Sequence, residues 1–565
     1  MNTMRLSRSL LRAALLVVAT TAVACSDDGP TAPQVQVPSA PTGVSAAAKS
    51  ATEATVTFGG VSGATGYVVE RAPGSGGSFA QVGTPTASPF EDKGLTASTA
   101  YRYRVAAVNS AGTGAFSDAV IVTTSAAGPK TALISADITS SRTLYADTLY
   151  TLRGFIKVAN GATLTVQPGT VIQGDYDVVG SSLFILRGAK IEANGTAEKP
   201  IVFTSSRPLG QRQAGDWGGL IIIGNGIINR TGDVQLEGTG TGASNPALLY
   251  SGGNNNADNS GTLRYVRVEF AGYATAADAE LNTFTFAAVG GGTTLEYLQA
   301  LSGLDDSYEF FGGAVDGKYL VSYDAGDDHF DMSEGYIGRL QHVIALQTRQ
   351  VIPRPGAGNV SSDPQGIEND GCNGAGCASG QDTQPFNVPM VANFTLVGPA
   401  DGIFSGTSGG IGMMLRRGTG GHYVNGVVAR WERAGISLRD QPTLNRATAG
   451  LLTVKNVHVA DVGATFQPQA GSTVQGTLDL AANSIVEGAG TGASLFVSVP
   501  LNPTNVSQLD WAPAANSAIA TGGMAAFTGD LATKAGTFVT ATAYRGAANP
   551  AGPKWWANWT SFAIN

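Results

Sequence analysis

The chain contains little cysteine, histidine or charge for its length. Only 3 Cys and 4 His occur in 565 residues, and charged residues make up 13%. No histidine has another His or Cys at helical spacing, so the His residues predict no metal site. The formal net charge is −8 and no basic stripe is present, so a nucleic-acid partner is not expected. The chain also lacks a GxGxxG frame followed by a helix, which excludes that type of nucleotide site.

Helical patterns and long apolar runs are also scarce. Amphipathic stretches rich in Glu, Lys and Leu are almost absent, and 76 Gly point to a turn-rich β protein. The longest apolar run, 13–24, is too short to span a bilayer, and no other run is long enough for a spanning helix. A chain of 565 residues exceeds one ordinary core, so we expect several domains or an elongated repeat.

The pattern of the first 25 residues predicts an export signal. Three arginines precede the apolar run, which ends "TAVAC" at Cys25. This resembles a bacterial lipoprotein signal, which implies that residues 1–24 are removed and that Cys25 is lipidated. A Pro-rich tether would follow at 25–37. The resemblance implies that the lipid anchors the protein in the outer membrane, where the protein is surface-exposed or periplasmic. Ordinary secretion is the alternative.

Residues 38–125 contain short alternating strands with turn signals every 8–12 residues, which favours a β-sandwich. The segments "PSAPTGV", "VSGATGYVVERA" and "LTASTAYRYRVAAVNSAGTGAFS" resemble a fibronectin type III domain. The resemblance implies a corner formed by Leu95 and Tyr101. It also implies a core aromatic residue, here Phe58 in place of the usual Trp. Such a module is a spacer or weak binder without a catalytic set.

Two acidic phrases repeat at a fixed distance. "LDDSYEFFGG" begins at Leu304 and "GDDHFDMSEG" at Gly326, 22 residues later. The same step separates Tyr297 from Tyr319. Thr262–Gly272 matches Thr294–Gly303 at a longer step, and we assign the excess to an inserted loop. This regularity predicts a solenoid of stacked parallel strands.

Two weaker regularities accompany these repeats. Phe286, Tyr308 and Phe330 follow one another at the same step as the acidic phrases, which predicts that they stack on one another. Gly169 and Gly188 share a 19-residue frame near the start of the repeat region. Together the repeats predict coils of about 19–22 residues.

The predicted fold is all-β: the sandwich, then a right-handed parallel β-helix over 131–565 with loop insertions at 273–282 and 350–388. The phrases "GDWGGLIIIGN", "DDSYEFFGGAV", "GDDHFDMSEGYIGRLQHVIALQ" and "IEND" resemble a group of envelope lipoproteins with a pectate-lyase-like right-handed β-helix. That resemblance implies a fold and a location but no reaction. Near the end, Trp555, Trp556 and Trp559 are expected to cap the open end of the stack or to form a sugar-binding patch.

Cys372 and Cys377 lie in the Gly-rich sequence "GCNGAGC". In an oxidising envelope compartment this spacing predicts a local disulfide. Half of a zinc site is the alternative, but no second Cys or His pair lies nearby.

If the acidic phrases stack in register, their carboxylates lie about 5 Å apart and repel by about 3 kcal/mol at an effective dielectric of 20. Three arrangements relieve this repulsion. The carboxylates can accept hydrogen bonds from turn amides. Asp306, Glu309, Asp328 and Asp331 can instead bind a cation, for which Ca²⁺ is the candidate. The same four residues with His329 can also form a catalytic set.

These alternatives give three function hypotheses. The leading one is non-catalytic binding or adhesion, to glycans or to a surface protein. The second is a polysaccharide hydrolase or lyase, and it requires the carboxylates in an open cleft beside His329, His422 or Arg354. The lyase form also needs a basic residue, and no Arg or Lys cluster occurs in the acidic phrases. The third is a structural envelope protein. A binder should present a row of exposed aromatic side chains without perturbed carboxylates, and a structural protein should present neither feature.

Overall fold

A computed structural model describes residues 34–74, 76–128, 130–277, 279–399, 402–404, 408–467, 474 and 476–562. The chain forms two compact units, one before residue 129 and one from residue 129 onward. The predicted signal peptide, Cys25 and most of the tether lie outside the described residues. In the described part, no helix is both long and apolar enough to cross a membrane.

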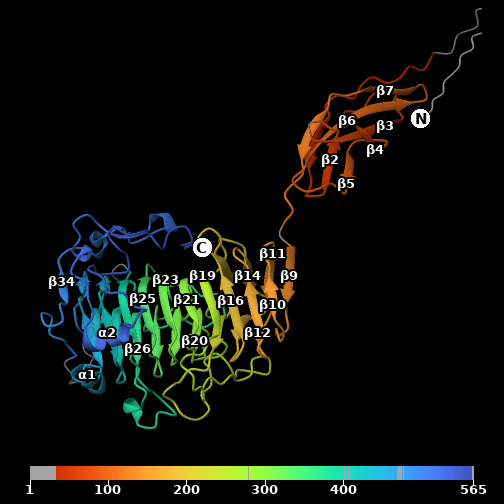
Figure 1. Ribbon diagram of the computed structural model, residues 1–565. Helices are drawn as coiled ribbons and strands as arrows, with labels where there is room; N and C mark the ends of the chain where they lie inside the picture. The colour runs from red at the N-terminus through yellow and green to blue at the C-terminus, as the bar shows by residue number, and fades with distance from the viewer. Residues whose placement is uncertain are drawn as a thin grey trace, which may run out of the picture. The chain divides into compact units, whose positions relative to one another are not determined.

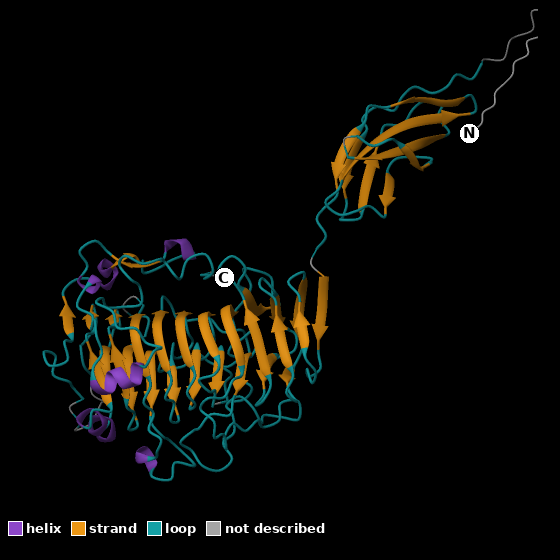
Figure 2. Ribbon diagram, in the orientation of Figure 1, coloured by secondary structure: helices purple, strands orange, loops and turns teal. Residues whose placement is uncertain are grey.

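The first unit is a sandwich of antiparallel strands (Figure 2). One sheet contains β1 (Ser45–Ala48), β2 (Glu53–Thr57) and β5 (Phe90–Lys93), and the other contains β3 (Gly66–Pro73), β4 (Ala80–Gly83), β6 (Ala100–Asn109), β7 (Gly112–Phe116) and β8 (Val120–Thr123). The predicted corner is confirmed, because Leu95 is buried and the Thr96 amide donates to Tyr101 Oη at 3.0 Å. Phe58 fills the core position, with its ring 4.6 Å from that of Tyr67.

The second unit is a parallel β-helix with two long sheets (Figure 1). The larger sheet contains β9 (Lys130–Ile134), β10 (Arg142–Leu144), β11 (Thr148–Leu152), β13 (Thr163–Val166), β14 (Val171–Gly174), β16 (Lys190–Asn194), β17 (Ile201–Ser205), β19 (Gly261–Glu269), β21 (Thr294–Leu301), β23 (Asp316–Tyr323), β25 (Arg339–Leu346), β27 (Met390–Val397), β29 (Gly421–Val424), β30 (Val427–Ala429), β32 (Leu452–Lys455), β33 (His458–Ala460) and β34 (Val486–Gly488). The smaller sheet contains β12 (Phe155–Val158), β15 (Ser182–Ile185), β18 (Gly219–Ile223), β20 (Phe284–Ala287), β22 (Tyr308–Phe311), β24 (Asp331–Ser333), β26 (Gln365–Asp370), β28 (Ile411–Arg416) and β31 (Ala434–Leu438).

The long strands of the larger sheet bend in their middle, so that each covers two faces of the coil. Before Tyr265, β19 pairs with β16, and after it β19 pairs with β17. Tyr265 has a φ of 49°, a left-handed conformation that is uncommon for a bulky residue. The same conformation recurs at the equivalent positions Tyr297, Tyr319, His342 and Asn393. The bend is therefore a repeated corner, and the smaller sheet forms the third face.

Most of the predicted stacking is confirmed. Tyr297 and Tyr319 stack with ring centroids 4.5 Å apart, and the rings of Tyr308 and Phe330 are 5.0 Å apart. Thr262 pairs with Thr294, so the longer step between these two segments does contain an inserted loop.

Two of the predicted alignments are wrong. Phe286 stacks on Phe310 rather than Tyr308, whose partner on that side is Phe284, because this coil is two residues longer than the step between the acidic phrases. The frame shared by the two glycines near the start is not a coil either. Leu164 pairs with Ile191 and Ile172 with Phe203, so these coils are unequal and both are longer than that frame. The two glycines each occupy a turn with positive φ, and they belong to different corners.

The predicted insertion at 350–388 is not a single loop. It contains β26, which pairs with β24 on one side and β28 on the other and so continues the smaller sheet. The sequence "QGIEND" carries only one large apolar side chain, that of Ile367, and therefore shows no strand pattern. The predicted disulfide between Cys372 and Cys377 is present, with a Cα–Cα distance of 5.8 Å.

The carboxyl-terminal residues 496–562 form what we call the C-terminal strap. It contains β35 (Phe496–Ser498), β36 (Asp510–Pro513) and α2 (Gly529–Ala535); α1 (Gln441–Thr448) precedes it. Figure 1 shows this segment returning along the coils as far as β19. Trp559 is fully buried, 5.7 Å from the ring of Tyr265, and Trp555 lies 5.1 Å from that of Tyr319.

The expected cap at the open end is therefore wrong, because these tryptophans cover the side of the middle coils, where the corner tyrosines offer an apolar row. The alternative of a sugar-binding patch is also contradicted for Trp556 and Trp559, which are 3% and 0% exposed.

Candidate functional site

The acidic phrases line a cavity of about 340 Å³ on the face formed by the smaller sheet. We call it the acidic cavity. Its carboxylates are those of Glu237, Asp305, Asp306, Glu309, Asp327, Asp328, Asp331, Glu334, Asp363, Glu368 and Asp370. All four predicted carboxylates, Asp306, Glu309, Asp328 and Asp331, are among them. Three arginines, Arg230, Arg416 and Arg417, also line it. The acidic side chains thus greatly outnumber the basic ones.

Parallel pairing brings three of these carboxylates into one row. Glu309 on β22 pairs with Asp331 on β24, and Asp331 pairs with Glu368 on β26. Neighbouring strands lie about 4.8 Å apart, so the three side chains point the same way at that spacing. The sequence spacing predicted the first pair. Glu368 was missed because a long insertion separates it from Asp331.

The aspartates before each strand are fixed by hydrogen bonds between coils. The Asp328 amide donates to Asp306 Oδ1 at 2.8 Å, and the Gln365 amide donates to Asp328 Oδ1 at 2.5 Å. Asn282 Oδ1 accepts from the Asp306 amide at 3.1 Å. The predicted structural role is therefore real, but each of these bonds to an aspartate engages Oδ1 alone.

The remaining oxygens converge in three overlapping groups. One ligand atom from each member lies within 4.8 Å of the others in the groups Asp305–Asp306–Asp327, Asp306–Glu309–Asp331 and Asp328–Asp331–Glu368. Two buried oxygens, Asp327 Oδ1 and Asp331 Oδ1, have no hydrogen-bond partner among the described residues. An unpaired buried acceptor is costly, and a set of carboxylate oxygens matches the preference of Ca²⁺. The residues present therefore fit a calcium ion.

The cavity opposes ionisation of its own carboxyl groups. Burial, with a smaller contribution from the neighbouring carboxylates, raises the pKa of Asp306, Glu309, Asp328 and Asp331 well above the usual range. Burial also raises the pKa of Asp327 to about 6. Without a cation, burial therefore favours the protonated form of these groups.

The structure corrects the expectation that no Arg or Lys cluster accompanies the acidic coils. Arg416, at the end of β28, contacts Glu368 and donates to Asp370 at 2.8 Å, while Arg417 contacts Asp370. Burial alone would lower the pKa of Arg416, but Asp370 and Glu368 outweigh burial and raise it. Its guanidinium stays charged, so it cannot accept a proton as a lyase base would.

None of the three basic residues expected beside the carboxylates lines the acidic cavity. His329 is 1% exposed, with Nδ1 2.5 Å from Ser322 Oγ and its ring 6.3 Å from Trp431. Burial lowers its pKa to about 3, so it has no role as a base there. His422 Nδ1 lies 2.9 Å from Thr453 Oγ1, and Arg354 stacks over Tyr176 at 3.9 Å. The structure therefore places the His329 ring apart from the carboxylates with which the sequence grouped it.

A larger cavity of about 670 Å³ adjoins the acidic one and shares Glu237, Asp305 and Asp327 with it. We call it the outer cavity. Its other walls come from Tyr273–Ala277 and Gly358–Ser361, so the predicted insertion at 273–282 forms one side. Tyr145 is the one aromatic side chain among the strongly exposed large apolar residues of the described chain. The exposed aromatic row expected of a binder is therefore absent from the described part of the chain.

Comparisons with known proteins agree with this architecture. Residues 136–500 match the family described as "Pectate-lyase like beta helix domain", and residues 39–123 match the fibronectin type III domain. A relative named Exoglucanase B, from Cellulomonas fimi, is 34% identical over 176 residues, which are 30% of this chain and 14% of the relative. The chain thus spans a small part of that relative's length.

Solved structures similar to the chain include an Fn3-like protein from Clostridium thermocellum, at 32% identity over 16% of this chain and 95% of that one. The FN5 domain of Drosophila Lar matches at 26% identity over 16% of this chain and 100% of that one. The TM-score is 0.15 in both cases.

Proposed function

Because the chain belongs to the pectate-lyase-like β-helix family, through residues 136–500, we propose that it is a glycan-binding protein whose acidic cavity holds Ca²⁺. One observation carries the proposal: three overlapping groups of carboxylates converge within 4.8 Å, and two of their buried oxygens lack a partner among the described residues. Ca²⁺ takes six to eight oxygen ligands in a flexible geometry. Adjacent groups that share Asp306 and Asp331 therefore suit it better than a smaller cation with a stricter coordination geometry.

The electrostatics of the cavity support a bound cation. Two ionised carboxylates 4.8 Å apart repel by about 3.5 kcal/mol at an effective dielectric of 20. Eleven carboxylates face three arginines, so ionisation of the whole set needs further positive charge. A divalent cation supplies it and competes with the protons that burial otherwise retains.

The outer cavity supports a sugar as the ligand. It opens beside Asp305 and Asp327, and its volume of about 670 Å³ is in the range of ordinary ligand sites. Sugar hydroxyls are oxygen ligands that can complete the coordination of a cation held by these carboxylates. The similarity to Exoglucanase B is in line with a carbohydrate ligand.

A calcium titration and a glycan array test the proposal. Chelator-treated protein lacking residues 1–25 is titrated with CaCl₂ by calorimetry and then applied to the array with Ca²⁺ or with EDTA. We expect calcium binding and calcium-dependent glycan retention, both lost in Asp331→Asn and kept in Glu198→Gln, an exposed carboxylate outside the cavity. Absence of calcium binding, or equal retention with EDTA, overturns it.

A polysaccharide hydrolase is the second candidate. It is favoured by the convergence of Asp306, Glu309 and Asp331 and by burial, which raises the pKa of Asp306 and Glu309, since a carboxyl group that retains its proton can act as general acid beside an ionised partner. A screen for new reducing ends on polysaccharides separates the two candidates. Product release that disappears in Glu309→Gln supports the hydrolase. If the unmodified protein releases no product, the result supports binding alone.

We further propose that the protein is anchored in the outer membrane by lipid on Cys25. The "TAVAC" sequence supports this anchor, although Cys25 lies outside the described residues. An anchored glycan binder would hold its ligand at the cell surface.

A further inference from the structure

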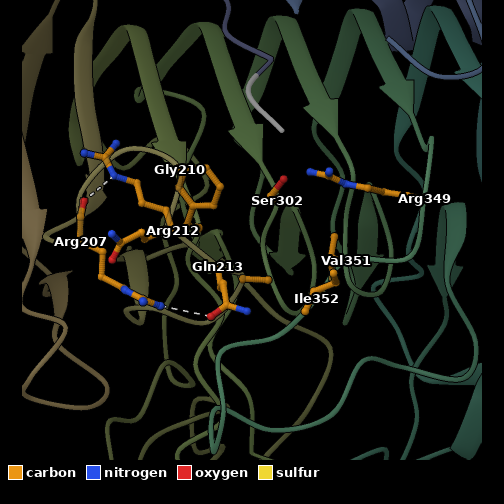
Figure 3. A pocket seen from close by; sticks show the side chains of 11 residues that line it. Arg207, Gly210, Arg212, Gln213, Ser302, Arg349, Val351 and Ile352 are labelled. Atoms are coloured by element: carbon orange, nitrogen blue, oxygen red, sulfur yellow. Dashed lines mark hydrogen bonds between the residues drawn. The ribbon is translucent and has the colours of Figure 1, made fainter. Parts of the chain in front are cut away.

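A third cavity, of about 320 Å³, lies beside the corner between β21 and β22. Its walls are the segment Gly210–Ala214, which leads toward β18, and the segment after β25. Its lining includes the side chains of Arg207, Arg212, Phe270, Ser302, Arg349 and Ile352 (Figure 3). We call it the basic cavity. Ala214 and Val351 of its wall belong to an apolar cluster with Leu304 and Ala357.

The charge of this cavity is positive. Among the described residues that line it, three are arginines and none is acidic. Arg207 donates to Gln213 Oε1 at 3.1 Å, and Arg349 Nε lies 3.2 Å from Asp324. Arg212 Nη1 lies 3.8 Å from Glu269, an acid that also pairs with another arginine. Burial outweighs the nearby acids and lowers the pKa of Arg212, so an added anion would stabilise its charged form.

Ser302 gives an independent sign of a ligand. It is 4% exposed, and its Oγ is buried without a hydrogen-bond partner among the described residues. A buried hydroxyl without a partner is costly. Its φ of 52° places this non-glycine residue in the left-handed region, where strain is tolerated mainly at structural corners and functional sites. Figure 3 shows Arg349 extending toward Ser302, so a charged donor and this hydroxyl face the same space.

The remaining wall is apolar. Phe270 and Val351 are 3% and 5% exposed, whereas Ile352 is 73% exposed. A fully hydrated inorganic ion gains no stabilisation from contact with such an apolar wall, whereas a ring or short carbon chain packs against it.

We propose that the basic cavity binds an organic oxyanion, namely a carboxylate, sulfate ester or phosphate ester carried on a ring. The oxyanion lies between Arg349, Arg212 and Ser302 Oγ, and the ring packs on Phe270 and Ile352. Arginine suits this chemistry because its planar donors match paired oxyanion oxygens. The site needs no metal and does not depend on the acidic cavity.

Calorimetry in EDTA at low salt tests the proposal, because the chelator removes any contribution of Ca²⁺. The probes are benzoate, phenyl sulfate and phenyl phosphate, with benzamide as the neutral analogue and inorganic sulfate and phosphate as ring-free anions. We expect one ring-bearing anion to bind at least tenfold tighter than benzamide and the inorganic ions, and to weaken as NaCl rises. The preferred probe identifies the oxyanion.

Two variants locate the binding. Arg349→Gln removes a partly exposed charge, and Ser302→Gly removes the hydroxyl while suiting the positive φ. We expect a loss of tenfold or more in the first and of about threefold to tenfold in the second. Arg264→Gln, which alters an exposed pair with Glu296 elsewhere on the β-helix, is the matched control and should bind normally. No anion binding, equal binding of benzamide, equal binding of the inorganic ions, or unchanged affinity in Arg349→Gln each overturns the proposal.

Discussion

Glu309 and Asp331 occupy directly paired positions on β22 and β24, although a whole coil of chain separates them. Both belong to the same candidate ligand group with Asp306. Stacking of this kind normally places identical apolar or amide side chains above one another, as it does for the corner tyrosines. Here it places like charges together, so the stability of these coils depends on what neutralises them.

Removing one charge from this pair should have opposite effects with and without calcium. In EDTA, at a pH where both carboxyl groups are ionised, Asp331→Asn should raise the melting temperature of the β-helix by several degrees, because it relieves about 3 kcal/mol of repulsion. In saturating Ca²⁺ the variant should melt below the unmodified protein, since it lacks a ligand. Calorimetric scans in both buffers measure this, and a lower melting temperature in EDTA would contradict it.

Stability of the calcium-free protein should fall as pH rises. Burial raises the pKa of Asp327 to about 6, above its unfolded value near 4. The folded state therefore holds the proton more tightly, and this contribution is present below about pH 4 and lost as pH rises through about 6. We expect the melting temperature in EDTA to fall between about pH 4.5 and pH 7.5. Saturating Ca²⁺ should reverse this slope, because binding requires the ionised form. A flat profile in EDTA would argue against it.

Loss of Trp559 should release the C-terminal strap before the coils unfold. Trp559 is fully buried between Tyr265 and Tyr297, and its carbonyl accepts from Arg267 at 3.0 Å. Trp559→Ala should cost about 3–5 kcal/mol. Limited proteolysis should then cut within 496–562 while the coils stay resistant. Val497→Ala, at an exposed site of the same strap, is the control and should be cut no faster than the unmodified protein.

Loss of the disulfide should weaken one wall of the acidic cavity. Cys372 Sγ lies 3.8 Å from the Asn229 carbonyl, and Asn373, between the cysteines, lines the cavity. Replacing both cysteines by alanine should cost roughly 2 kcal/mol through the short closed loop and should weaken calcium binding. Titration of both proteins measures the affinity. A reducing agent should reproduce the effect in the unmodified protein and have none in the double variant.

Replacement of Cys25 should release the protein from the membrane. Without the thiol no lipid can be attached, so Cys25→Ser expressed in a bacterial host should lose labelled palmitate and move to the soluble fraction. Continued membrane fractionation of the variant would contradict the proposed anchor.

The sequence was most informative where coils have equal length. Asp306, Glu309, Asp328 and Asp331 were brought together correctly because no insertion interrupts the step between their phrases. Glu368 and Arg416 reach the same cavity from coils of irregular length, so no spacing connects them with the acidic phrases. Side-chain direction was a second limit: His329 directly follows Asp328, yet its ring lies inside the coil, bonded to Ser322.

The corner residues and the strap were beyond sequence reasoning for another reason. A left-handed Tyr at position 265 or 297 contradicts local preference and is fixed only by the coils on either side. The strap is rich in Ala, Gly and Thr and has no period. Its place is decided by long-range contacts such as that of Trp555 with Tyr319, which no local pattern encodes.

The position of the strap also has a consequence for biogenesis. Translation proceeds from the amino terminus, so Tyr265, Tyr297 and Tyr319 are made long before the residues that cover them. Until the last residues emerge, each nascent molecule carries a bare aromatic seam along its middle coils. Premature termination or proteolytic trimming at the carboxyl end would leave these aromatic side chains permanently exposed to other molecules. Only molecules with an intact strap are therefore protected against aggregation through this surface.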